Sequence, residues 1–93
     1  MTVLNGTAVP GLAASYGDMV EGRGFELGEV TNSATSFTDS VVMFERGHAP
    51  EARRVARELA IERLRLMTPE IRSVSGGAPV SVIVGEDNAS TAG

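Results

Sequence analysis

The sequence predicts an α+β fold, the ferredoxin-like β-α-β-β-α-β two-layer sandwich. Apolar residues recur at helical spacing in two segments, and four short segments with strand-like patterns, either β-branched runs or alternating residues, are arranged around them in that order. Right-handed crossovers would place both helices on one face of a four-stranded, mainly antiparallel sheet, with the other face open to solvent. Periodicity does not define strand order, so an α/β sandwich with another order is an alternative.

The length predicts one domain. The chain has 93 residues, of which 42% are hydrophobic and only 4% aromatic. A second core would leave both cores too small, so one core is built mainly from aliphatic side chains. We assign residues 1–87 to the domain and residues 88–93 to a flexible tail, because the last residues are small and polar.

The first half of the chain predicts a strand, a helix and a strand. Residues 2–4 are rich in β-branched residues and end at Asn5 and Gly6, a dipeptide typical of turns. Residues 7–21 carry apolar side chains at helical spacing, which predicts the first helix. Residues 25–30 begin with alternating apolar and acidic residues, as in a strand with one exposed face.

The second half predicts a strand, a helix and a final strand. Residues 38–44 form a β-branched run that is apolar on both faces, which indicates a central strand. Residues 50–66 form the clearest amphipathic helix, although its apolar stripe spreads after residue 60, so the last turns are either covered on several sides or no longer helical. Residues 71–74 suggest a short edge strand, and residues 80–84 alternate as a last strand.

Composition excludes several kinds of chemistry. The chain has eight cationic residues, all of them Arg, and twelve acidic residues, which gives a net charge of −4. An acidic domain lacks the charge that drives nucleic-acid binding, so no nucleic-acid partner is expected. The absence of Cys and Lys excludes disulfides, thiolate zinc sites and Schiff-base catalysis. No apolar run is long enough to cross a bilayer, so we expect membrane attachment only through an anchor elsewhere in a parent chain.

No catalytic, metal-binding or cofactor-binding group stands out. The acidic residues are scattered singly, His48 is the only histidine, and no serine lies in a nucleophile motif. General acid–base or nucleophilic catalysis needs grouped partners. We therefore expect no catalytic residues, no metal, no cofactor and no enzymatic activity.

The first candidate binding segment is the turn at Asn5, Gly6 and Thr7, together with Gly11. A glycine turn that opens onto a helix N-terminus exposes backbone N–H groups to an anion. The alternative is that this segment is only a tight strand-to-helix turn.

The second candidate is an arginine patch at Arg53, Arg54 and Arg57 near the start of the second predicted helix. Guanidinium groups bind phosphate or carboxylate as bidentate forks. The alternative is a solvated helix face, because Glu51 and Glu58 flank the arginines.

Several motifs together resemble the LytR C-terminal domain family. They span residues 2–87, and the most distinctive is the Leu-Asn-Gly-Thr turn followed by Gly-Leu-Ala. The motifs are Val3-Leu4-Asn5-Gly6-Thr7, Pro10-Gly11-Leu12-Ala13, Gly24-Phe25, Val41-Val42-Met43-Phe44 and Val82-Ile83-Val84-Gly85-Glu86-Asp87. The resemblance implies an extracytoplasmic domain of a bacterial cell-envelope protein. The phosphotransferase activity found in such proteins belongs to a different domain and has no counterpart here.

Two functional hypotheses follow. The first is a non-enzymatic accessory domain that binds cell-wall polymer, either peptidoglycan or a linked glycopolymer, or an envelope protein. The second is a structural or oligomerisation module that pairs with a second copy or with its parent protein through a sheet edge or an open sheet face.

Overall fold

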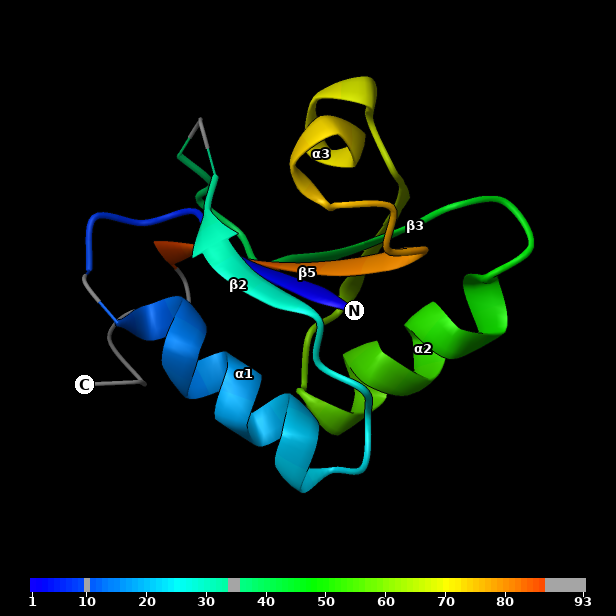
Figure 1. Cartoon of the computed structure of the whole chain (residues 1–93), viewed down its shortest axis with the longest axis horizontal. Coiled ribbons are helices and arrows are strands. Elements are labelled where there is room, and N and C mark those ends of the chain that lie inside the picture. Colours follow the sequence, from blue (N-terminus) through cyan, green and yellow to red (C-terminus); the bar gives the residue numbers. More distant parts are fainter. Residues whose placement is uncertain (10, 34–35, 87–93) are drawn as a thin grey trace.

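A five-stranded mixed sheet lies at the centre of the domain, with helices on both of its faces (Figure 1). The computed structural model describes residues 1–9, 11–33 and 36–86; the tail predicted at residues 88–93 lies outside them. The elements along the chain are β1 (Thr2–Asn5), α1 (Leu12–Gly22), β2 (Glu29–Asn32), β3 (Val41–Phe44), α2 (Ala49–Glu58), β4 (Arg63–Leu66), α3 (Pro69–Val74) and β5 (Val80–Val84).

The strand order is β2-β1-β5-β3-β4. Strand β1 pairs in parallel with β2 and β5, and β3 pairs in parallel with β4. Only the β3–β5 pairing is antiparallel among the described strands. The α+β class is thus confirmed, but the four-stranded, mainly antiparallel ferredoxin-like sheet is wrong. The chain instead forms two parallel β-α-β units, and β5 joins them.

The missed strand, β4, lies within the segment predicted as the end of the second helix. Helix α2 ends at Glu58, and Ala60 then adopts a left-handed conformation with φ of 57°. The N–H of Ile61 donates to the carbonyl of Ala56 at 2.8 Å, which closes the helix end. Residues 63–66 then alternate Arg-Leu-Arg-Leu, the two-residue period of a strand, so the spreading stripe marked the exit from the helix.

The segment predicted as an edge strand at residues 71–74 is helical. Thr68 caps α3 because its Oγ1 accepts a hydrogen bond from the N–H of Ile71 at 3.3 Å, and Pro69 lies in the first turn. Ile71 is the buried residue of this six-residue helix. So short a helix has too few buried apolar positions to show a helical period. Its sequence therefore predicts a strand instead of a helix.

Helix α1 and strands β2 and β3 are shorter than predicted. Helix α1 begins at Leu12 rather than residue 7, because Gly11, at φ of 80°, is its N-cap and a hydrogen-bonded turn precedes it. Strand β2 covers residues 29–32 rather than 25–30, since Phe25 and Leu27 pack against the core from the loop before it. Strand β3 begins at Val41 rather than residue 38.

The sheet separates two apolar clusters. Helices α1 and α2 cover one face, as predicted for the two helices, and pack against the larger cluster (Figure 1). Helix α3 covers part of the opposite face, so the prediction of a fully open second face is wrong. The smaller cluster beneath α3 contains Leu4, Val41, Met43, Met67, Ile71 and Ile83.

A buried chain of hydroxyl groups fastens α3 to the sheet. The Oγ1 of Thr2 donates to the carbonyl of Ser75 at 2.8 Å, and the Oγ of Ser75 lies 2.6 Å from that of Ser81. The Oγ of Ser75 also donates to the carbonyl of Ile71 at 2.7 Å. These bonds compensate for the desolvation of the buried hydroxyls and fix the C-terminal end of α3 over β1 and β5.

Strand β5 has the bounds predicted for the last strand, residues 80–84. It is the central strand of the sheet, and all five of its residues are buried. Val80, Val82 and Val84 pack in the α1–α2 cluster, whereas Ile83 packs under α3. Directly after it, the N–H of Gly85 donates to the Oγ of Ser40 at 2.8 Å. A Cβ on Gly85 would overlap the backbone of Asp39 and lie 2.7 Å from the N of Ser40, so only glycine fits there.

We predict that Gly85→Ala lowers the free energy of unfolding by about 1–3 kcal/mol or more, because backbone must move to accommodate the methyl group. Urea denaturation measures this change. The matched control is Gly22→Ala at the end of α1, where a Cβ meets nothing within 4 Å. That variant should leave stability unchanged or raise it by up to about 1 kcal/mol. Equal stability of the two variants would contradict the close approach at Gly85.

Candidate functional site

The turn after β1 is closed by its own hydrogen bonds. The Oδ1 of Asn5 accepts from the N–H of Thr7 at 2.9 Å and from its Oγ1 at 2.7 Å. The Nδ2 of Asn5 donates to the carbonyl of Val9 at 2.7 Å, and the N–H of Val9 donates to the Oγ1 of Thr7 at 3.1 Å. The structure therefore brings the predicted residues together, but these donors already have partners within the turn.

Gly6 in this turn meets the central strand. Its N–H donates to the carbonyl of Val84 at 2.8 Å, and its carbonyl accepts from the N–H of Phe37, also at 2.8 Å. A Cβ on Gly6 would lie 2.9 Å from the carbonyl oxygen of Val84. The distinctive Asn-Gly-Thr motif thus has a structural explanation, and anion binding by Asn5, Gly6, Thr7 and Gly11 stays a prediction.

The three arginines of α2 differ in their contacts. The guanidinium of Arg54 lies over the ring of Phe25, 5.1 Å from its centroid, in a cation–π contact. Arg53 and Arg57, four residues apart on one helix face, are exposed and form no ion pair with any residue that the structure describes. Arg53 and Arg57 are the part of the predicted patch free to bind an anion.

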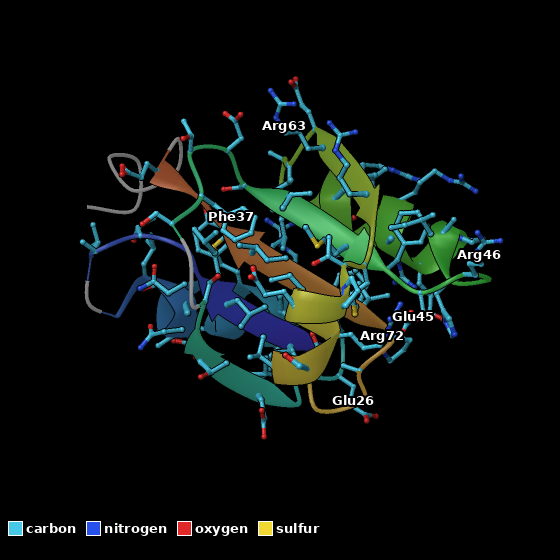
Figure 2. All side chains as sticks on the ribbon, turned by 90° about the horizontal axis from the view of Figure 1, so that it is seen from above. Glu26, Phe37, Glu45, Arg46, Arg63 and Arg72 are labelled. Carbon is cyan, nitrogen blue, oxygen red and sulfur yellow. The ribbon has the colours of Figure 1, made fainter. Side chains whose placement is uncertain are left out.

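A groove of about 640 Å³ lies on the α3 side of the sheet, over β3 and β4. In Figure 2, α3 lies over the middle of the sheet and leaves strands β3 and β4 uncovered, which opens this groove. We call this feature the β3–β4 groove. Its lining includes Phe37, Thr38, Asp39, Met43, Arg63, Arg65 and Thr68.

Alternation along β4 supplies the basic side of the β3–β4 groove. Leu64 packs against the α1–α2 cluster, so Arg63 and Arg65 point to the opposite face. An Nη of Arg63 lies 3.2 Å from a carboxylate oxygen of Asp39. Arg65 forms no ion pair with the residues in the described ranges. One guanidinium of the groove is therefore available to a ligand.

The remaining lining combines apolar and hydroxyl groups. Val41 and Met43 of β3 are buried, and Phe37 is half-buried beside them. Thr38 and Thr68 line the same groove. An apolar surface with an aromatic ring, hydroxyl groups and a cation can bind a polar ligand that also has apolar faces, as a sugar has.

A second charged pair lies beside the groove at the far end of β3. The guanidinium of Arg72 donates two hydrogen bonds to the carboxylate of Glu45, each 2.9 Å long (Figure 2). The hydrogen bonds from Arg72 hold the pKa of Glu45 below its ordinary value of 4.5. This pair links α3 to the end of β3.

No group of three or more potential metal ligands occurs among residues 1–9, 11–33 and 36–86. His48 lies at the start of α2, where its Nδ1 is 3.1 Å from a carboxylate oxygen of Glu51. None of the described helices is long and apolar enough to span a membrane. Among its lining residues, the β3–β4 groove holds one carboxylate, from Asp39, and two guanidinium groups, from Arg63 and Arg65.

Comparison with known proteins identifies the family. Residues 1–87 match the sequence profile of the LytR C-terminal family, described as LytR cell envelope-related transcriptional attenuator. The chain belongs to this family. The solution structure of the C-terminal domain of RV0431 is similar to this LytR C-terminal domain, with 28% sequence identity and a TM-score of 0.55. The similarity covers 90% of this chain and 69% of the other. No curated protein matches at a significant level.

Sequence reasoning missed the β3–β4 groove of this LytR C-terminal domain. Its residues come from the loop before β3, from β3, from β4 and from the cap of α3, so only the sheet topology brings them together. One signal was present: the alternation of residues 63–66 predicts a strand with both arginines on one face. The helical period of the preceding residues instead extends the predicted helix over this segment.

We predict that Arg72→Gln raises the pKa of Glu45 toward 4.5, as measured by NMR titration, because the hydrogen bonds that favour the carboxylate are lost. The folded-state pKa lies below the unfolded one, so the pair contributes stability above pH 4.5 that is lost as pH falls through the folded pKa. Arg46→Gln, a neighbour in the chain, should leave this pKa unchanged. An unaltered Glu45 pKa in Arg72→Gln would show that the hydrogen bonds from Arg72 do not lower it.

Proposed function

We propose that this domain is a non-enzymatic accessory module that binds an anionic cell-wall polymer in the β3–β4 groove. The family places the domain in cell-envelope proteins, and polymer binding is the further step. The observation that carries it is the position of Arg65, which lies in a groove with an apolar floor and has no carboxylate partner in the described residues. On this proposal the domain acts outside the cytoplasm, where the polymer is.

The lining of the groove suits a glycan that carries phosphate or carboxylate groups. Guanidinium groups bind such anions with charge-assisted hydrogen bonds. The ring of Phe37 and the side chain of Met43 offer apolar surface to the faces of a sugar ring, and threonine hydroxyls offer hydrogen bonds to its hydroxyl groups. An envelope protein with an acidic segment is the alternative occupant, which the experiment below separates from a glycan.

The charge distribution disfavours nucleic acid as this anion. The net charge is −4, so a long polyanion would be repelled by the domain as a whole. A polymer with widely spaced charges could place one anionic group at Arg65 and leave its neutral sugars along the apolar floor. The spacing of the charges therefore favours a cell-wall polymer over DNA, although the family description contains the words transcriptional attenuator.

We predict that purified sacculi with their attached glycopolymers retain the wild-type domain and that Arg63→Ala/Arg65→Ala weakens retention by about ten- to a hundredfold. Each lost hydrogen bond to an anion costs roughly 1–3 kcal/mol. The matched control is Arg53→Ala/Arg57→Ala, which removes the same charge from α2, on the other face of the sheet.

The outcomes separate the candidates. Loss of retention only in the groove variant supports the proposal, whereas loss only in the α2 variant moves the site to the predicted arginine patch. Sacculi that retain the domain no better than an unrelated protein of equal charge would exclude wall binding, and an envelope protein would become the favoured partner. Measurements at low and high salt show the ionic part of the interaction.

A further inference from the structure

The sheet has two exposed edges that differ in charge. Strands β2 and β4 are the outermost strands in the order β2-β1-β5-β3-β4, and the outer edge of each pairs with no strand of the described residues. Strand β4 carries Arg63 and Arg65, whereas β2 begins with Glu29. Unpaired backbone N–H and C=O groups at such edges accept another strand.

The complementary charges lie on the same face of the sheet. Glu29 and Thr31 pair with Thr2 and Leu4 of β1, both of which face α3. The arginines of β4 also face the α3 side, in the β3–β4 groove. Glu29 and Arg65 would therefore meet if the two edges were joined with the sheet faces aligned.

The strand directions permit this junction. Strand β2 runs parallel to β1 and β5, whereas β3 and β4 run antiparallel to β5. A second copy in the same orientation thus presents its β2 antiparallel to the β4 of the first copy. Antiparallel pairing forms a regular ladder of hydrogen bonds between the two edges.

We propose that a second copy of this chain pairs its β2 with β4 and extends the sheet. The register that places Arg65 opposite Glu29 also places Leu64 opposite Val30 and Arg63 opposite Thr31. An ion pair on the α3 face and an apolar pair on the α1–α2 face then form together. The proposal is argued from the two sheet edges, but its ion pair uses Arg65, so the junction and an anionic polymer compete for the same guanidinium.

Exposed apolar side chains lie at both of these edges. Val30 on β2 is 41% exposed and Leu66 on β4 is 51% exposed, although both are large hydrophobic residues. Pairing brings Val30 beside Leu64 and diagonal to Leu66, where all three lose contact with water. Two β4 edges paired antiparallel would instead set arginines against each other, so charge favours the β4–β2 junction.

The junction is heterologous, because each copy uses a different edge. Each added copy leaves a free β2 at one end and a free β4 at the other, so the copies form an open row. All copies keep the same orientation, which places their β3–β4 grooves on the same face of the row. A four-residue strand pair is a small interface, so the association of isolated domains is weak and depends on concentration.

The test is a dilution series followed by NMR and sedimentation, from about 1 mM protein downward, where a millimolar dissociation constant is measurable. We expect concentration-dependent amide shifts at residues 29–32 and 63–66 together with a rising weight-average mass. Glu29→Arg and Arg65→Glu should each weaken association about five- to tenfold, since an attractive pair becomes repulsive. Glu21→Arg on α1 makes the same charge change away from both edges and should have no such effect.

Mixing the two variants gives the decisive result. In an equimolar mixture of Glu29→Arg and Arg65→Glu, every junction between unlike variants carries opposite charges. The mixture should therefore associate more strongly than either variant alone, as the wild type does at about half the total concentration. A monomer at every concentration, shifts confined to other elements, or a mixture that stays dissociated would each overturn the proposal. Retention of Glu29→Arg on sacculi reports on the groove alone, because Glu29 is not part of its lining.

Discussion

Strand β5 holds the two β-α-β units of the domain together. Unit β1-α1-β2 and unit β3-α2-β4 share no strand pairing with each other, and each is bonded to one side of β5. All five residues of this strand are buried, and they supply apolar side chains to the clusters on both faces. Strand β5 therefore contributes to both cores, and Gly6 and Gly85 let neighbouring backbone approach its C-terminal end.

The central position of β5 determines what the molecule exposes. Because the last strand is inserted between the two units, the second strand of each unit becomes an edge of the sheet. The short helix before β5 covers only the middle of one face, so the groove over β3 and β4 is left open (Figure 2). The groove and the complementary edges thus follow from one topological feature, the insertion of β5 between the two units.

The sequence predicts those elements whose local pattern is unambiguous and misses those decided by distant partners. Residues 80–84 and the body of both long helices were predicted because their apolar periods are clear. The exit from α2 was missed because Ala60 takes the left-handed conformation that glycine usually adopts, so no residue type marks the break. The direction of pairing and the groove could not be predicted, since Phe37, Met43 and Arg65 come from three separate segments that only the tertiary structure brings together.

Native-state hydrogen exchange of the wild-type domain tests the role of β5 most directly. If β5 holds the two units together, the slowest amides of β1, β3 and β5 open in a single step and share one free energy of opening, with the same dependence on denaturant. The amides of the edge strands and α3 would open at lower free energies. Amides of β1 and β3 that exchange with clearly different free energies, one unit opening while the other stays protected, would contradict this account.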